Sequence, residues 1–428
     1  MSAPPVVRER VLRAASEIAA EAVDFAAELV RIPTVNPPGE HYEDAARAIG
    51  DRLARGGFVV SLLRAEGRPE HTAAHPRTNV LGILEGAGPG PCLHLNGHFD
   101  VVPPGDGWSL DPFAGLVRDG RLYGRGACDM KAGIAAAVCA AEAVRRAGVR
   151  LHGRLEISGT VDEESGGFAG VAWLCEQGFI ARARTDYVII PEPFGVDRVC
   201  VGHRGVWWFE IETHGRTAHG SMPYLGESAI DAMAAILETV RLELVPALAR
   251  RRTRMPVVPE GSRRATLNVN AVWGGQAGEP VQTPCVADRC TAIFDRRYLP
   301  EEGLEAARRE LDELLGRVRA RVPGLRCEVR DRMVVPPVET PEGSPLVGRL
   351  GQAIREVCGR EAQLVASPGS YDHKHVARIA GVEHCVAYGP GPLELAHQPD
   401  EHCPVSDIAD ATRVLALAML DLCGVAGA

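Results

Sequence analysis

Apolar and polar positions follow two different periods along the chain. Residues 6–30 and 42–55 carry apolar side chains at three- and four-residue spacing, which predicts amphipathic helices. Residues 58–63 and 79–84 are short apolar runs of the kind that form buried strands. Because helical and extended segments continue to alternate, we expect an α/β fold, a mostly parallel sheet with helices on both faces.

The pattern changes from residue 206. The predicted order becomes strand, helix, strand, strand, helix, strand, which is the order of a ferredoxin-like domain. These elements are predicted at 205–214, 227–244, 265–273, 285–295, 301–321 and 325–335. Pro336 and Pro337 end the series as a linker. We therefore expect a domain at 206–336, inserted into a larger one formed by 1–205 and 337–428.

Composition narrows the class of protein. With 428 residues, 46% of them hydrophobic, the chain can bury a large core and form two domains. A formal net charge of −9 argues against nucleic acid or an anionic membrane as partner. The sequence contains no run of eighteen apolar residues, so no transmembrane helix is expected. The amino terminus lacks the pattern of a secretion signal, so a cytoplasmic location is expected. The twelve cysteines form no Cys-x-x-Cys pair, which favours buried thiols.

Candidate chemistry begins at the end of the strand predicted at 92–97. His98 and Asp100 lie two positions apart on extended chain, so they point to the same side at the carboxyl end of the strand. Asp100 is placed to fix the tautomer of a metal-binding His98. Asp129 follows in a glycine-broken loop before a helix predicted at 131–146. A lone His-x-Asp pair is more often a surface hydrogen bond than a pair of metal ligands. The motifs further along the chain therefore decide between these two interpretations.

Two more predicted strands end in carboxylates. The strand at 154–160 runs into Glu163 and Glu164, and the strand at 186–190 is followed by Glu192. An acidic first turn that complements a helix dipole is one explanation of the glutamate pair. The other is a division of labour, in which one glutamate binds a metal and its neighbour acts as general base. Histidine or glutamate follows three predicted strands, and this repetition favours a metal ligand beside a general base.

A nitrogen donor for a second metal is found near the carboxyl terminus. His397 stands in a proline- and glycine-rich segment, residues 388–401. A single histidine in such a loop is more often a surface residue than a ligand. His397 is nevertheless the best candidate to complete the set.

These five separated motifs resemble the cocatalytic zinc amidohydrolases and exopeptidases, the family of aminoacylase, acetylornithine deacetylase, succinyl-diaminopimelate desuccinylase and the bacterial glutamate carboxypeptidases. The resemblance covers nearly the whole chain. It implies two zinc ions per subunit, replaceable by cobalt or manganese. Their implied ligands are His98, Asp129 as the bridge, Glu164, Glu192 and His397.

The resemblance also implies catalytic roles. Asp100 would orient His98, and Glu163 would be the general acid/base. The loop 215–223 resembles the family's lid loop, in which His219 would donate a hydrogen bond to the oxyanion from the partner subunit of a homodimer. A solvated loop histidine is the alternative for His219. The inserted domain would thus serve as lid and dimerisation domain.

Substrate-binding residues follow the same resemblance. Asn268 and an arginine after Asp295 match the positions that hold the substrate carboxylate. Arg297 shares a strand face with Asp295 and is preferred to Arg296, although either could form an ordinary ion pair.

The substrate class rests on two features. Glu192 matches the deacetylase and desuccinylase branches, whereas carboxypeptidases and dipeptidases have aspartate there. We therefore expect hydrolysis of a small N-acyl amino acid, with a dipeptidase or carboxypeptidase as the alternative. An amidase or deaminase acting on another compound and a non-catalytic relative are further alternatives. The chain departs from the family at His373, Lys374 and His375, which suggests an acidic or unusual acyl group near the mouth of the site.

Overall fold

The computed structural model describes residues 3–67, 71–276 and 284–427. They form two compact units. Unit 1 comprises the chain up to residue 202, residues 339–365 and the chain from residue 371, and unit 2 comprises residues 203–338 and 366–370. None of the helices in the described part of the chain is long and apolar enough to cross a membrane.

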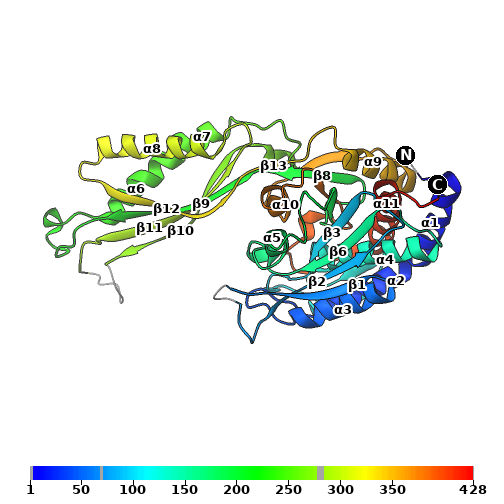
Figure 1. Cartoon of the computed structure of the whole chain (residues 1–428). Helices are drawn as coiled ribbons and strands as arrows, with labels where there is room; N and C mark the ends of the chain where they lie inside the picture. The colour runs from blue at the N-terminus through cyan, green and yellow to red at the C-terminus, as the bar shows by residue number, and fades with distance from the viewer. Residues whose placement is uncertain (1–2, 68–70, 277–283, 428) are drawn as a thin grey trace. The chain divides into compact units, whose positions relative to one another are not determined.

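Unit 1 is built on a nine-stranded sheet (Figure 1). Its order is β1-β2-β6-β3-β7-β15-β8-β13, with β14 paired to β8. The strands are β1 (Val59–Ala65), β2 (Arg77–Leu84), β3 (Cys92–His98), β6 (Arg154–Thr160), β7 (Tyr187–Ile190), β8 (Arg198–His203), β13 (Val338–Glu339), β14 (Gln363–Ser367) and β15 (Cys385–Ala387). The central strands β6, β3, β7 and β15 are parallel, while β1, β2 and β8 run antiparallel to their neighbours. The predicted α/β sheet is confirmed, and its parallel part is the centre.

Helices cover both faces of this sheet. On one face α3 (Tyr42–Arg55) and α4 (Ala132–Arg146) approach closely, because Gly159 and Gly97 leave room for Ile49 and Ile134. On the opposite face α10 (His373–Arg378) begins beside β3 and contacts α5 (Val171–Glu176). The remaining helices of unit 1 are α1 (Pro5–Glu17), α2 (Ala19–Val30), α9 (Pro345–Cys358) and α11 (Val405–Cys423).

Two local predictions differ from the structure. The helix expected at 6–30 is two helices, because the backbone turns at Ile18 so that both halves pack their apolar sides in the core. A small sheet of β4 (Leu116–Arg118), β5 (Arg121–Tyr123) and β16 (His402–Pro404) was not predicted, since strands of three residues carry no periodic signal.

A row of polar side chains lies buried between β3 and β6. His94 and Asn96 face their register partners Glu156 and Ser158 on the α10 side of the sheet. The His94 ring hydrogen-bonds Glu156 at 3.0 Å and Ser158 at 2.7 Å, and Ser158 donates to Asn96 at 2.7 Å. Because each of these groups is paired, the row is tolerated in a core that is otherwise apolar.

Unit 2 is a four-stranded antiparallel sheet with two main helices. Its order is β10-β11-β9-β12, which in chain order is the ferredoxin-like arrangement expected from the sequence. The elements are β9 (Gly205–His214), α6 (Ala229–Thr239), a π-helical turn (Val240–Leu244), α7 (Val245–Leu248), β10 (Thr266–Gly275), β11 (Arg289–Tyr298), α8 (Leu304–Arg321) and β12 (Arg326–Val335). Phe209, Ile211, Phe294 and Leu314 lie in its core.

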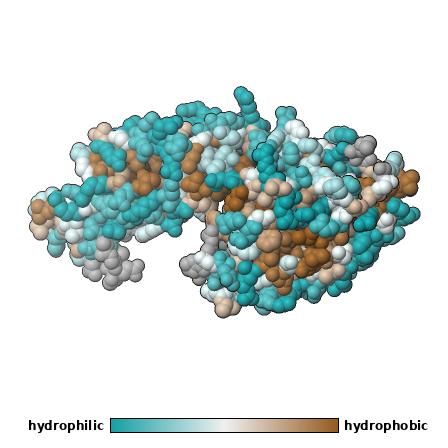
Figure 2. All heavy atoms as spheres, viewed as in Figure 1, coloured by the Kyte–Doolittle hydropathy of each residue, from teal (hydrophilic) through white to brown (hydrophobic). Residues whose placement is uncertain are grey.

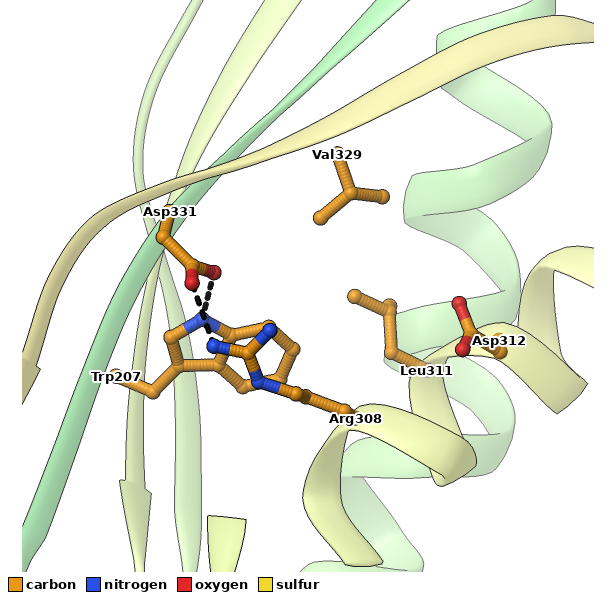
Figure 3. A pocket seen from close by; sticks show the side chains of 6 residues that line it. All are labelled: Trp207, Arg308, Leu311, Asp312, Val329 and Asp331. Atoms are coloured by element: carbon orange, nitrogen blue, oxygen red, sulfur yellow. Dashed lines mark hydrogen bonds and ion pairs between the residues drawn. The ribbon is translucent and has the colours of Figure 1, made fainter. Parts of the chain in front are cut away.

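A shallow pocket separates α8 from β12 (Figure 3). The Asp331 carboxylate at its edge accepts hydrogen bonds from the Trp207 indole and the Arg308 guanidinium. These contacts join the helix to the sheet, so the pocket is part of the packing of unit 2. Hydrophilic residues dominate the surface seen in Figure 2, in keeping with a charged fraction of 24%.

Candidate metal centre

The carboxyl ends of adjacent strands bring the predicted site residues of unit 1 together. His98 is the last residue of β3, and Glu192 lies two residues beyond β7, its parallel neighbour. Glu163 and Glu164 form a short 3₁₀ turn (Glu163–Ser165) after β6, on the other side of β3. Parallel neighbours end at the same edge of a sheet, so these side chains converge there.

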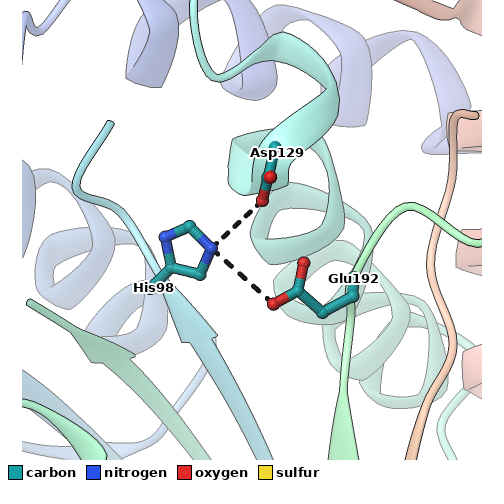
Figure 4. Close-up of side chains that lie close together, drawn as sticks. All are labelled: His98, Asp129 and Glu192. Atoms are coloured by element: carbon teal, nitrogen blue, oxygen red, sulfur yellow. Dashed lines mark hydrogen bonds and ion pairs between the residues drawn. The ribbon is translucent and has the colours of Figure 1, made fainter. Parts of the chain in front are cut away.

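The first donor group contains His98, Asp129 and Glu192 (Figure 4). His98 Nε2 lies 3.1 Å from Asp129 Oδ1 and 3.7 Å from Glu192 Oε1. All three side chains point toward one another: His98 from the end of β3, Asp129 from the π-helical turn Ala127–Lys131, and Glu192 from the segment after β7. Their close approach makes a set of one nitrogen and two carboxylates.

The second donor group contains Asp129, Glu164 and His397. His397 Nε2 lies 3.0 Å from Glu164 Oε1 and 3.5 Å from Asp129 Oδ2. Asp129 thus turns one carboxylate oxygen to each histidine. This is the geometry required of a carboxylate that bridges two cations.

The buried carboxylates of the two donor groups favour the binding of cations. Burial raises the pKa of Glu164 to about 7 and holds the pKa of Glu192 well above its usual range. The hydrogen bond with Glu164 raises the pKa of His397 to about 9. Both glutamates therefore favour a nearby positive charge, because burial disfavours unpaired carboxylates. Imidazole and carboxylate donors suit zinc, and also cobalt and manganese.

Asp100 supports this site in two ways. Its backbone oxygen accepts a hydrogen bond from His98 Nδ1 at 3.1 Å, and its carboxylate lies 3.5 Å from the same nitrogen. This leaves Nε2 of His98 directed at the donor group. The Asp100 carboxylate also accepts the backbone N–H groups of Glu163 and Glu164, each at 3.1 Å. Asp100 therefore connects the His98 strand to the glutamate turn, a role that the sequence did not indicate.

A second residue that supports the site, Glu401, was not predicted from the sequence. Glu401 is fully buried, and its Oε1 accepts the backbone N–H groups of Cys128 and Asp129 at 2.8 and 3.0 Å. Its Oε2 accepts a hydrogen bond from buried Arg125 at 2.6 Å. Glu401 thus fixes the Asp129 loop. Both residues lie within motifs noted above, but no local pattern predicts a contact between segments so far apart.

Replacing Glu401 by alanine is expected to destabilise the metal-free protein by about 3–5 kcal/mol, because the buried Arg125 guanidinium loses its carboxylate partner. Chemical denaturation measures this difference. Glu383→Ala is the matched control, since that carboxylate is 60% exposed and pairs loosely with Arg182. Equal free energies of unfolding for the two variants would contradict the role assigned to Glu401.

His373, Lys374 and His375 differ from expectation. All three are buried, with exposures of 1%, 6% and 8%. His373 hydrogen-bonds the Tyr371 hydroxyl, His375 Nε2 donates to a backbone carbonyl, and the Lys374 ammonium contacts Glu163. The suggestion that they recognise an acyl group at an open mouth is therefore not supported, because all three side chains are buried.

The remaining predicted residues belong to unit 2. His219 lies in an exposed loop and accepts hydrogen bonds from Ser221. Asn268 on β10 lies opposite Asp295 on β11, and Arg297 makes a two-pronged ion pair with Asp295 at 2.7 and 3.0 Å. Arg296 instead points into the core and pairs with Glu302. Arg297 and Asp295 share a strand face as expected, and Arg296 has a structural partner.

Comparisons with known proteins identify the family. The model of the family described as "Peptidase family M20/M25/M40" matches residues 94–421 of this chain. Succinyl-diaminopimelate desuccinylase of Gluconacetobacter diazotrophicus is 30% identical over 417 residues, which cover 94% of this chain and 97% of that one. The protein of the same name from an Azoarcus species is 30% identical over 398 residues, covering 91% and 94%.

Solved structures share the fold. Human carnosine dipeptidase 1 superposes with a TM-score of 0.75 at 20% identity, covering 98% of this chain and all of that chain. A Bacillus subtilis protein, described as a dinuclear metal-binding peptidase from the M20 family, gives a TM-score of 0.66 at 17% identity, covering 95% and 99%. With its two donor groups, this chain belongs to peptidase family M20/M25/M40 and is a metal-dependent deacylase or peptidase.

Proposed function

We propose that this protein hydrolyses the amide bond of a small N-acyl amino acid with the help of two zinc ions. The observation that carries the proposal is Asp129, whose two carboxylate oxygens face separate donor groups, each with one histidine and one glutamate. His98 and Glu192 would hold one ion, and Glu164 and His397 the other.

The chain's own residues would divide the chemistry. When bound, the ions polarise the scissile carbonyl and make water a better acid. Glu163 accepts the proton of the attacking water and returns it to the leaving amine. Its turn is anchored by Asp100, which holds the backbone of Glu163 at the edge of the sheet where the donor groups lie. Glu163 and Glu164 are thereby kept in separate roles, although they are adjacent in sequence.

The relatives support a substrate with an acidic acyl group. The most similar sequences described above are named succinyl-diaminopimelate desuccinylases, so N-succinyl amino acids are the first candidates. Asn268 and Arg297 would hold a substrate carboxylate, since a guanidinium binds a carboxylate through two parallel hydrogen bonds. To bind the substrate carboxylate, Arg297 would break its ion pair with Asp295. The alternative substrate is a dipeptide, favoured by the fold shared with carnosine dipeptidase 1.

The test is release of free amine from N-succinyl, N-acetyl, N-formyl and N-carbamoyl amino acids and from dipeptides, with zinc- or cobalt-loaded protein. We expect N-succinyl amino acids to give the highest kcat/KM. A dipeptide at the top of the ranking would favour the alternative. Absence of turnover on every compound, with two ions bound per chain, would overturn the proposal and favour another amide or a non-catalytic role.

We further propose a homodimer formed through unit 2. Its edge strand β10 exposes Val272 and Trp273, at 50% and 52%, and α6 exposes Ile230. Unpaired backbone groups and apolar side chains at one sheet edge suit association with a second copy.

Subunit mixing tests the dimer and His219 together. His219→Ala and Glu163→Gln are each expected to be nearly inactive. If His219 of the partner subunit serves each site, random reassociation of equal amounts restores roughly a quarter of wild-type activity, since half the dimers are mixed and each has one intact site. Wild-type-like kcat in His219→Ala, or no recovery on mixing where both variants are dimers, would contradict this role.

A further inference from the structure

Lysine is almost absent from this protein. The chain has 47 lysine and arginine residues, and only Lys131 and Lys374 are lysines. Both lie in unit 1 and both are buried, with exposures of 0% and 6%. Every exposed basic side chain in the described part of the chain is therefore an arginine or a histidine.

The two lysines make different contacts. Lys131 donates to the backbone oxygen of Ile32 at 2.7 Å and so connects the start of α4 to the segment after α2. Lys374 Nζ lies 3.4 Å from Oε1 of Glu163, and the two side chains are only 7% and 12% exposed. Lys374 thus places a positive charge against the carboxylate to which we assign proton transfer.

Lys374 is itself held on both sides. The preceding Asp372 accepts a hydrogen bond from Asn96 at 3.0 Å, and Asn96 lies on β3 two residues before His98. The following His375 donates through Nε2 to the Gly166 carbonyl at 2.7 Å, at the far end of the glutamate turn. The first turn of α10 therefore contacts the glutamate turn at two points, the side chain of Glu163 and the backbone carbonyl of Gly166.

We propose that Lys374 is a positioning residue that holds the Glu163 carboxylate in the orientation needed for proton transfer; this rests on the proposed function through the role of Glu163. A free glutamate side chain samples several rotamers, and ordering it costs free energy. A charge-assisted contact from an anchored helix selects one of them in advance. Precise placement matters because a displacement of about 1 Å at a reacting group can cost about 100-fold in rate.

The central experiment compares Lys374→Met, Lys374→Arg and, as matched control, Arg378→Met, which removes an exposed cation from the same helix. We expect Lys374→Met to lower kcat by about 10- to 100-fold with KM changed less than about 2-fold. Two ions per chain remain bound. The Tm is expected to fall, because the largely buried Glu163 carboxylate loses its cation, so the rates are compared at a temperature at which all variants stay folded. Lys374→Arg keeps kcat within about 5-fold and the control is unchanged.

A double-mutant cycle separates positioning from general damage. In Glu163→Asp the carboxylate is one methylene shorter and no longer reaches Lys374. Adding Lys374→Met to this background should change kcat less than about 2-fold, whereas independent effects would multiply. Multiplying effects, or an unchanged kcat in Lys374→Met alone, would overturn the proposal.

A readout without turnover keeps this inference distinct from the proposed function. In crystal structures of Lys374→Met we expect the Glu163 carboxylate to leave its wild-type rotamer or to occupy more than one. A single wild-type rotamer would overturn the positioning role even if no substrate were found. Conversely, failure of wild-type protein on every amide would refute the proposed function while the structural result still decided the role of Lys374.

Discussion

Glu163→Gln is expected to lower kcat by a factor of about 10³ or more while two metal ions stay bound. General acid–base catalysis by one side chain contributes about 10²–10⁴ in rate, and glutamine has nearly the same shape but cannot take up a proton. The backbone bond from Glu163 N–H to Asp100 is unaffected by the change. The fold and the donor groups should therefore survive, and the loss should appear in kcat.

Glu176→Gln is the control, because this exposed glutamate at the end of α5 undergoes the same chemical change outside the site. Both variants are compared with wild-type protein by kcat on the best amide and by metal content after dialysis. If Glu163→Gln retained more than a tenth of the wild-type kcat with full metal, another group would have to be the general base.

Asp129→Ala is expected to abolish binding of both metals. Its two oxygens face the two donor groups separately, so a single substitution removes one ligand from each set and leaves two neighbouring cations without the negative charge between them. At a zinc concentration that saturates wild-type protein, we expect less than one ion per chain and no measurable amide hydrolysis. Equilibrium dialysis with elemental analysis gives the number directly.

His397→Ala provides the comparison for Asp129→Ala. It removes a ligand from the second group alone, so about one ion per chain should remain, held by His98, Glu192 and Asp129. Glu401, which fixes the Asp129 backbone, is unchanged in both variants. Two ions retained by Asp129→Ala would rule out a bridging role, and equal losses in the two variants would mean that the ions bind only as a pair.

Elements with a strong periodic pattern were predicted almost residue by residue. The strands expected at 154–160 and 205–214 and the helix expected at 42–55 coincide with β6, β9 and α3. Their apolar positions face the core, so burial and local pattern agree. The prediction was poorer where no such pattern exists: the strand expected from 285 is observed only from Arg289, and the long first helix breaks at Ile18. Element ends depend on packing that a local window does not contain.

The candidate site was predictable because its chemistry lies at strand ends. His98, Glu164 and Glu192 are marked by an apolar strand just before each of them, and neighbouring parallel strands must bring their ends together. Asp129 and His397 lie in segments predicted as loops and were candidates because of their neighbouring motifs. The family resemblance assigned their roles, and the structure places both beside those strand ends. The sequence did not reveal that Lys374 lies inside the protein, since charged residues in a short loop segment are normally exposed.

The sequence by itself determined the α/β class, the ferredoxin-like order of the second unit and the residue types of a two-metal hydrolytic site. The first two follow from local periodicity, and the residue types of the site follow from residues near strand ends together with the family resemblance. Only the tertiary structure decided that Glu401 and Arg125 fix the Asp129 loop, that Asp100 holds the glutamate turn, and that Lys374 contacts Glu163. These pairs join segments 63 to 276 residues apart. Contacts at such separation depend on how whole elements pack together, and no short-range pattern specifies them.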